Sequence, residues 1–143
     1  MDLKELLRTQ SGEILENALQ SLNCAHLKSY SKSSQSENKK RLLNLLTLTQ
    51  QCVVEKKLIP MKEYAAQIAK ERFDAGFDLH EVHTAFNALE EELWNRVTKN
   101  ISAENLGEAL GLISTVLGVG KEELALTYVS LASKTRTQTL NLT

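Results

Sequence analysis

The sequence has 143 residues, with 17 Lys or Arg and 18 Asp or Glu, so its formal net charge is −1. A chain of this length predicts one domain over residues 1–143 with a core of its own, and the balanced charge predicts no partner among nucleic acids or anionic membranes. No window is long and apolar enough for a membrane span, and the first residues lack the apolar stretch of a signal peptide, so we expect a cytoplasmic protein. Abundant Leu with few Gly and one Pro favours an all-α fold, a bundle of four main helices plus one or two short helices.

The first segment predicts an amphipathic helix that starts at a capping box. Asp2 and Glu5 have the spacing of that motif. Ser11 and Gly12 then interrupt the pattern, as a kink or a break, and the helical spacing continues to about Leu27. A polar stretch with five serines follows over residues 29–36, which we interpret as a flexible loop.

Ser34 is placed to cap the next helix, which we expect over about residues 37–57. Its apolar stripe holds Leu42, Leu45, Leu46, Thr49 and Val53. Leu43 and Leu48 lie off that stripe, because successive residues turn by about 100° around a helix. A small bundle seldom surrounds one helix completely, so these two leucines predict an exposed face and a homodimer with two-fold symmetry.

Residues 60–97 predict two helices joined by a hinge at Gly76. Pro60 suits the first turn of a helix. Gly76 follows the last apolar residue of that helix, where a left-handed backbone favours glycine. Asp78 and Glu81 then have the spacing of a capping box for the second helix, which extends to about Val97.

This hinge carries a resemblance to a known family. The motif residues are Ala69, Arg72, Phe73, Gly76, Phe77, Leu79, Val82, Ala85 and Phe86, with Leu93 and Trp94 further on. Over about 40 residues the pattern resembles the N-terminal domain of the RsbT co-antagonist proteins. The resemblance implies an all-helical regulatory or sensor input domain (RsbRD-like) in the cytoplasm, of the kind that usually continues into an output domain.

The last part of the chain predicts two helices separated by a turn. Ser102 can cap the first of them, and the sequence Gly118-Val119-Gly120 is interpreted as a helix–helix turn. A second helix opens at Lys121, and residues 135–143 read as a polar tail. The two cysteines, Cys24 and Cys52, each fall in a helical pattern and are expected to be small buried hydrophobes.

One flank of the second hinge helix collects polar side chains. His83, Asn87, Glu90 and Trp94 follow one another there, and they are candidates for lining a small-molecule groove or a subunit interface. His80 and His83 are one residue short of the spacing in a HExxH zinc motif, and no Glu-x-x-His occurs, so we expect no metal and no cofactor. Arg72 lies on the inner edge of its stripe, which indicates a structural ion pair or a gate for an acidic ligand.

These features predict a signalling or regulatory interaction domain rather than an enzyme, with no catalytic residues. It would act by association with a partner protein or with itself. The alternative is a sensor module that binds an unknown small molecule between helices near His83, Asn87, Glu90 and Trp94. A metal-dependent enzyme is a third hypothesis, which would require His80 and His83 to converge with distant carboxylates.

Overall fold

A computed structural model describes the backbone of residues 1–141 and the side chains of residues 1–135. Within that range the regular secondary structure is entirely helical, which confirms the predicted all-α bundle. The helices are α1 (Leu3–Cys24), α2 (Lys28–Lys32), α3 (Gln35–Glu55), α4 (Ile59–Asp74), α5 (Leu79–Asn100) and α6 (Ala103–Asn141). None of them combines the length and apolarity needed to span a membrane.

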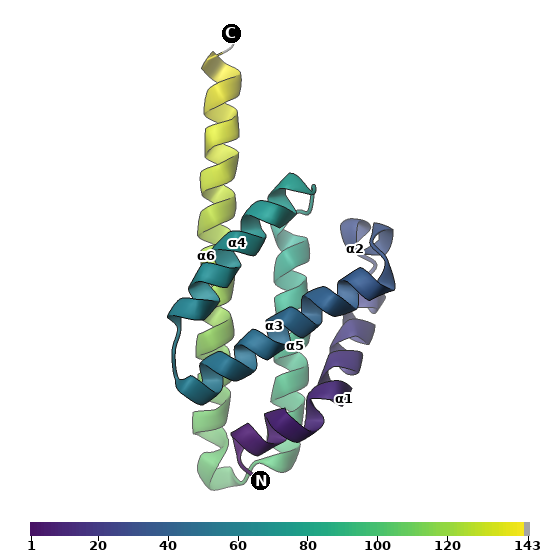
Figure 1. Cartoon of the computed structure of the whole chain (residues 1–143), viewed down its shortest axis with the longest axis vertical. Coiled ribbons are helices and arrows are strands. Elements are labelled where there is room, and N and C mark those ends of the chain that lie inside the picture. The colour runs from purple at the N-terminus through teal and green to yellow at the C-terminus, as the bar shows by residue number, and fades with distance from the viewer. Residues whose placement is uncertain (142–143) are drawn as a thin grey trace.

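The helices pack around α5 and α6, which run side by side. α5 contacts α1 on one side and α6 on the other, while α4 lies along α6. α3 crosses in front of α5 (Figure 1). α6 has 39 residues against 22 in α5, so it is about 58 Å long at 1.5 Å per residue, and its last turns project beyond the other helices (Figure 1).

The core is formed by the apolar stripes of all the long helices. Its fully buried large side chains are Leu6, Leu7, Ile14, Leu22, Leu42, Leu46, Met61, Phe86, Leu89, Leu93, Ile113 and Leu117. Burial of each such side chain contributes about 1.5–3 kcal/mol. The helices on both sides of the hinge, α4 and α5, contribute four of these twelve side chains, and α1, α3 and α6 supply the others.

The hinge between α4 and α5 has the predicted geometry. Gly76 has a φ angle of +86°, and Phe77 N–H donates to the Arg72 carbonyl at 2.9 Å, which ends α4. The Glu81 carboxylate accepts from the Asp78 N–H at 2.9 Å, as a capping box requires. Phe77 is buried, so the hinge is held by packing as well as by its backbone.

The predicted turn at residues 118–120 is wrong, because α6 continues through it. Gly120 is buried, and a Cβ atom there would meet the Phe86 ring at 2.8 Å and the Met61 sulfur at 3.0 Å. A glycine in the middle of a helix is tolerated where another helix approaches closely. Gly120 therefore marks close packing of α6 against α4 and α5, and the chain does not turn there.

Three further expectations about local structure need correction. The segment predicted as a polar loop over residues 29–36 contains the short helix α2, because Tyr30 is buried and Ser29 bonds to Glu81. α1 runs without a break through Ser11 and Gly12. Cys52 is buried as expected, but Cys24 is exposed, and both are free thiols.

The predicted polar tail over residues 135–143 begins inside a helix. The backbone of α6 is helical as far as Asn141. The remainder of the predicted tail, residues 142–143, lies outside the described residues.

Candidate functional site

The polar flank predicted as a ligand groove is a seam between α5 and α6. The Lys121 ammonium contacts the Asn87 side-chain oxygen at 3.1 Å and the Glu90 carboxylate at 3.0 Å. His83 Nε2 lies 3.0 Å from the Lys121 carbonyl oxygen. Three of the four predicted side chains therefore converge on one residue of α6, and the arrangement holds two helices together.

Trp94 lies on the same seam but remains 42% exposed. Its indole N–H donates to the Ser114 hydroxyl at 3.2 Å, so the ring is oriented by α6. Glu90, Glu91 and Asn95 border the open surface around it. Trp94 is thus a rim residue with one free face.

The histidines have no metal-binding neighbours in the part of the chain that the structure describes. His80 is exposed at the start of α5, while His83 faces α6. Within that part, no three His, Cys, Asp or Glu side chains are grouped closely enough to hold a metal ion. The hypothesis of a metal-dependent enzyme therefore has no candidate site among these residues.

Arg72 is placed away from that seam, beneath the hinge. It lines a small cavity with Tyr30, Arg41 and Tyr64, which come from α2, α3 and α4. The guanidinium carbons of Arg41 and Arg72 lie 5.2 Å and 5.9 Å from the centroid of the Phe77 ring. The sequence indicated an unusual position for Arg72, but it gave no sign that Arg41 and Tyr30 would join it.

The two leucines predicted for a dimer face differ in exposure. Leu43 is 45% exposed on α3. Leu48 is half-buried and packs against the core. Only Leu43 of the pair therefore presents much apolar surface, and the predicted α3 contact stays a prediction.

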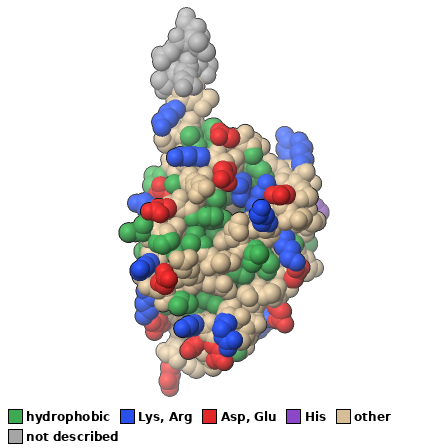
Figure 2. All heavy atoms as spheres, in the orientation of Figure 1, with side chains coloured by type: hydrophobic (Ala, Val, Ile, Leu, Met, Phe, Trp, Pro, Cys, Tyr) green, Lys and Arg blue, Asp and Glu red, His purple; other side chains and the backbone are tan. Residues whose placement is uncertain are grey.

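A larger apolar surface lies where the start of α4 meets the middle of α6. We call it the α4–α6 surface. One hollow in it is lined by Leu58, Ile59, Lys62, Val119, Glu122, Glu123 and Leu126. The surface also includes Val129, which is exposed three residues further along α6. Ile59 is 68% exposed, Leu126 59% and Val129 63%. Figure 2 shows hydrophobic side chains interspersed with basic and acidic ones on the face that includes α4.

Sequence reasoning missed this surface, although one signal was present. Leu126 and Val129 are three residues apart and lie off the buried stripe that Leu124 and Tyr128 form. Residues at this spacing share a face of a helix. The sequence did not indicate that α4 would bring Ile59 beside Leu126.

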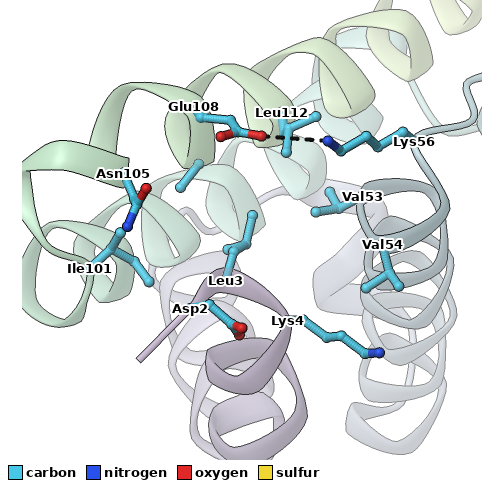
Figure 3. A pocket seen from close by; sticks show the side chains of 11 residues that line it. Asp2, Leu3, Lys4, Val53, Val54, Lys56, Ile101, Asn105, Glu108 and Leu112 are labelled. Carbon is cyan, nitrogen blue, oxygen red and sulfur yellow. Dashed lines mark ion pairs between the residues drawn. The ribbon is translucent and has the colours of Figure 1, made fainter.

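A pocket lies between the start of α1, the end of α3 and the first turns of α6 (Figure 3). Its volume is about 370 Å³, and Leu3, Val53 and Leu112 are among the side chains that line it. A salt bridge of 3.5 Å between Lys56 and Glu108 spans one side. This volume is at the low end of the range for small-molecule sites, about 300–1,000 Å³.

No protein-family model, no curated protein and no solved structure matches this chain.

Proposed function

We propose that this protein is a regulatory domain, without catalytic activity, that self-associates through the α4–α6 surface. The supporting observation is the exposure of Ile59 and Leu126 in one hollow between α4 and α6, with the exposed Val129 three residues further along α6. Contiguous exposed apolar side chains rimmed by charges are typical of protein–protein contacts. The hinge motif, which resembles the RsbT co-antagonist N-terminal domain, supports a regulatory role independently.

Charge placement favours a second copy of the chain as the partner. Lys62 lies on the α4 side of the surface, whereas Glu122 and Glu123 lie on the α6 side. Among residues 1–135 none of the three takes part in an ion pair within the chain. A two-fold contact would place α4 of one copy over α6 of the other, so that Lys62 meets the two glutamates while the apolar side chains meet each other.

The projecting part of α6 could carry a conformational change away from the dimer contact. α6 lines the proposed contact at Leu126 and Val129 and continues to Asn141 as one helix. A rigid helix carries a small rotation or shift from the contact to its far end. We propose that formation or loss of the dimer rotates or shifts α6, and that this movement reaches the far end of the helix.

Sedimentation at micromolar concentration tests this proposal. We expect a dimer for the wild type and a monomer for Leu126→Glu, because the glutamate would bury a charge at the contact. Leu43→Glu on α3 is the matched control, since Leu43 is a leucine of similar exposure on the alternative face. A monomeric wild type would overturn the proposal. A dimer disrupted only by Leu43→Glu would move the contact to α3.

A second candidate function, a small-molecule sensor, is favoured by the pocket of Figure 3. Its mixture of apolar side chains with the Lys56 and Glu108 charges suits a small amphipathic ligand. Ala109 lines the pocket and is buried, so Ala109→Phe would fill it. If the pocket holds such a ligand, mass spectrometry of the denatured wild type should detect a co-purifying small molecule. That molecule should be missing from Ala109→Phe and present in the exposed α6 variant Ala132→Phe.

A further inference from the structure

Residues 24–34, which include α2, leave the bundle and return to it at one point, at the edge of the molecule (Figure 1). The side-chain amides of Asn23, in α1, and Gln35, in α3, bond to each other in both directions, at 2.9 Å and 3.2 Å. The two ends of the segment therefore lie side by side. Compact surface segments with close ends are frequently functional, and such a segment can move without displacing the helices that flank it.

This segment, which we call the flap, rests on the bundle through a narrow contact. Tyr30 is its single buried residue, at 5% exposure, and Leu27 is only partly buried. A helix of five residues such as α2 is too short to be stable without tertiary packing. A hollow of about 220 Å³ also lies against the flap, lined by Leu22, Asn23, Leu27, Tyr30, Ser31 and Gln35.

On its inner side, Tyr30 closes the small cavity that holds Arg41 and Arg72. That cavity has a volume of about 20 Å³. The Tyr30 ring meets the Phe77 ring edge-on, with the centroids 4.9 Å apart, and the Tyr30 carbonyl accepts from the Asn38 side chain at 2.9 Å. Because Tyr30 lines both the outer hollow and the inner cavity, it separates the two.

The main polar attachment of the flap is the Glu81 carboxylate, which is 4% exposed. It accepts from the Ser29 N–H at 2.7 Å and from the Ser29 hydroxyl at 2.8 Å. Arg41 adds one bond, to the Ser33 hydroxyl at 3.0 Å. The Glu81 oxygen that accepts from the Ser29 hydroxyl, Oε2, also accepts from the Asp78 N–H of the hinge. Hydrogen bonds to a charged group are roughly twice as strong as neutral ones, so the two bonds to Glu81 hold the flap most firmly.

We propose that the flap is a lid over the cavity at Arg72, which opens as a unit about Asn23 and Gln35 and is held closed by the Ser29–Glu81 bonds. Opening withdraws the Tyr30 ring and joins the outer hollow to the inner cavity. It also removes one of the two donors on Glu81 Oε2, so the lid is linked to the capping box that starts α5. No residue of the flap belongs to the α4–α6 surface, so the lid acts independently of any dimer contact.

Amide hydrogen exchange of the native wild type, followed by NMR, tests whether the flap opens as a unit. The amides of Ser29, Ser31 and Ser33 donate to Glu81, to the Leu27 carbonyl and to the Ser29 carbonyl. We expect equal protection of these three amides and little dependence on urea, because a small opening exposes little surface. Amides in the middle of α1 and α3 should need global unfolding and depend steeply on urea. A steep dependence for the three flap amides, or three unrelated protection factors, would overturn the proposal.

A pair of serine variants tests the attachment to Glu81. Ser29→Ala removes the hydroxyl bond and should speed the exchange of the Ser31 and Ser33 amides about tenfold, since a hydrogen bond to a charged group is lost. Ser31→Ala is the matched control, because Ser31 is an exposed residue of the same short helix. It brings the same gain in helix propensity and should not speed the exchange of the Ser33 amide. Equal exchange of the Ser33 amide in the two variants would show that Ser29 does not hold the flap closed.

The side chain of Arg72 reports whether the flap covers the cavity. Its Nε is buried and has no hydrogen-bond acceptor among the described residues, so its proton has no partner that would slow exchange with solvent other than burial itself. We expect this Hε proton to exchange at the rate of flap opening, about tenfold faster in Ser29→Ala than in Ser31→Ala. The same Hε exchange rate in both variants would show that the cavity opens by another route and that the flap is not its lid.

Discussion

The ring edge of Phe86 lies 2.8 Å from the position that a Cβ atom would occupy on Gly120. Real Cβ atoms do not approach other heavy atoms so closely, and the Met61 sulfur lies almost as near, at 3.0 Å. α4, α5 and α6 therefore meet at a point where only a hydrogen atom fits. This contact explains why the α6 helix contains a glycine two turns before its buried Tyr128.

Gly120→Ala should consequently destabilise the protein. The added methyl group would force Phe86 and Met61 out of their positions, and overpacking of this kind typically costs about 1–3 kcal/mol. That cost exceeds the gain in helix propensity from Gly to Ala, about 1 kcal/mol. Urea unfolding measures the difference.

Gly118→Ala is the matched control, and it should have the opposite sign. Gly118 lies in the same helix, but a Cβ atom there would have nothing within 4 Å. We expect a stabilisation of about 0.5–1 kcal/mol from the reduced backbone freedom of the unfolded chain. If the two substitutions had equal effects, the close contact at Gly120 would not exist in solution.

The pair Gly118 and Gly120 also shows what could not be predicted from the sequence. A Gly-Val-Gly sequence looks like a turn, and only the approach of Phe86 from α5 reveals its packing role. The hinge at Gly76 was predictable because its signals are local: a capping box, a proline and a helical period that ends. The cavity at Arg72 was not predictable, since α2, α3 and α5 line it together with α4, and these helices meet only in the folded bundle.

Gly76→Val tests the backbone of the hinge. A φ angle of +86° is strained for any residue with a Cβ atom, most of all for a β-branched one. We expect a loss of about 1–3 kcal/mol in the free energy of unfolding. Gly107→Val is the control, because a Cβ atom at Gly107, in the first turns of α6, would meet nothing within 4 Å. This substitution should change the free energy of unfolding by only about a few tenths of a kcal/mol. Equal stability of Gly76→Val and the wild type would contradict the left-handed backbone at the hinge.

Glu81 should make the protein sensitive to acid. Burial alone would raise the pKa of its carboxyl, but the hydrogen bonds from Ser29 and Asp78 outweigh it and hold the pKa below the ordinary value of 4.5. A carboxyl with a lowered pKa contributes stability that is fully present above its unfolded-state pKa and is lost as the pH falls through the folded-state value.

Glu81→Gln should therefore be less stable than the wild type at pH 7, by about 1–3 kcal/mol. The gap between the two proteins should narrow as the pH falls below about 4.5, because the wild type then loses its charged acceptor. Denaturant unfolding at a series of pH values gives both curves. Glu63→Gln, on the exposed surface of α4, is the control and should follow the wild type. If the difference in stability between the wild type and Glu81→Gln were constant from pH 7 to pH 3, the charge of Glu81 would not contribute to stability.

A charge exchange across the α4–α6 surface tests the proposed two-fold contact. Lys62→Glu would place like charges opposite Glu122 and Glu123 of the second copy, so we expect the dissociation constant of the dimer to rise at least tenfold. Combining Lys62→Glu with Glu122→Lys and Glu123→Lys restores opposite charges and should recover most of the affinity, with a salt dependence like that of the wild type. Sedimentation at several protein concentrations measures each constant. A triple variant that associates no better than Lys62→Glu alone would show that α4 does not lie over α6 of the partner copy.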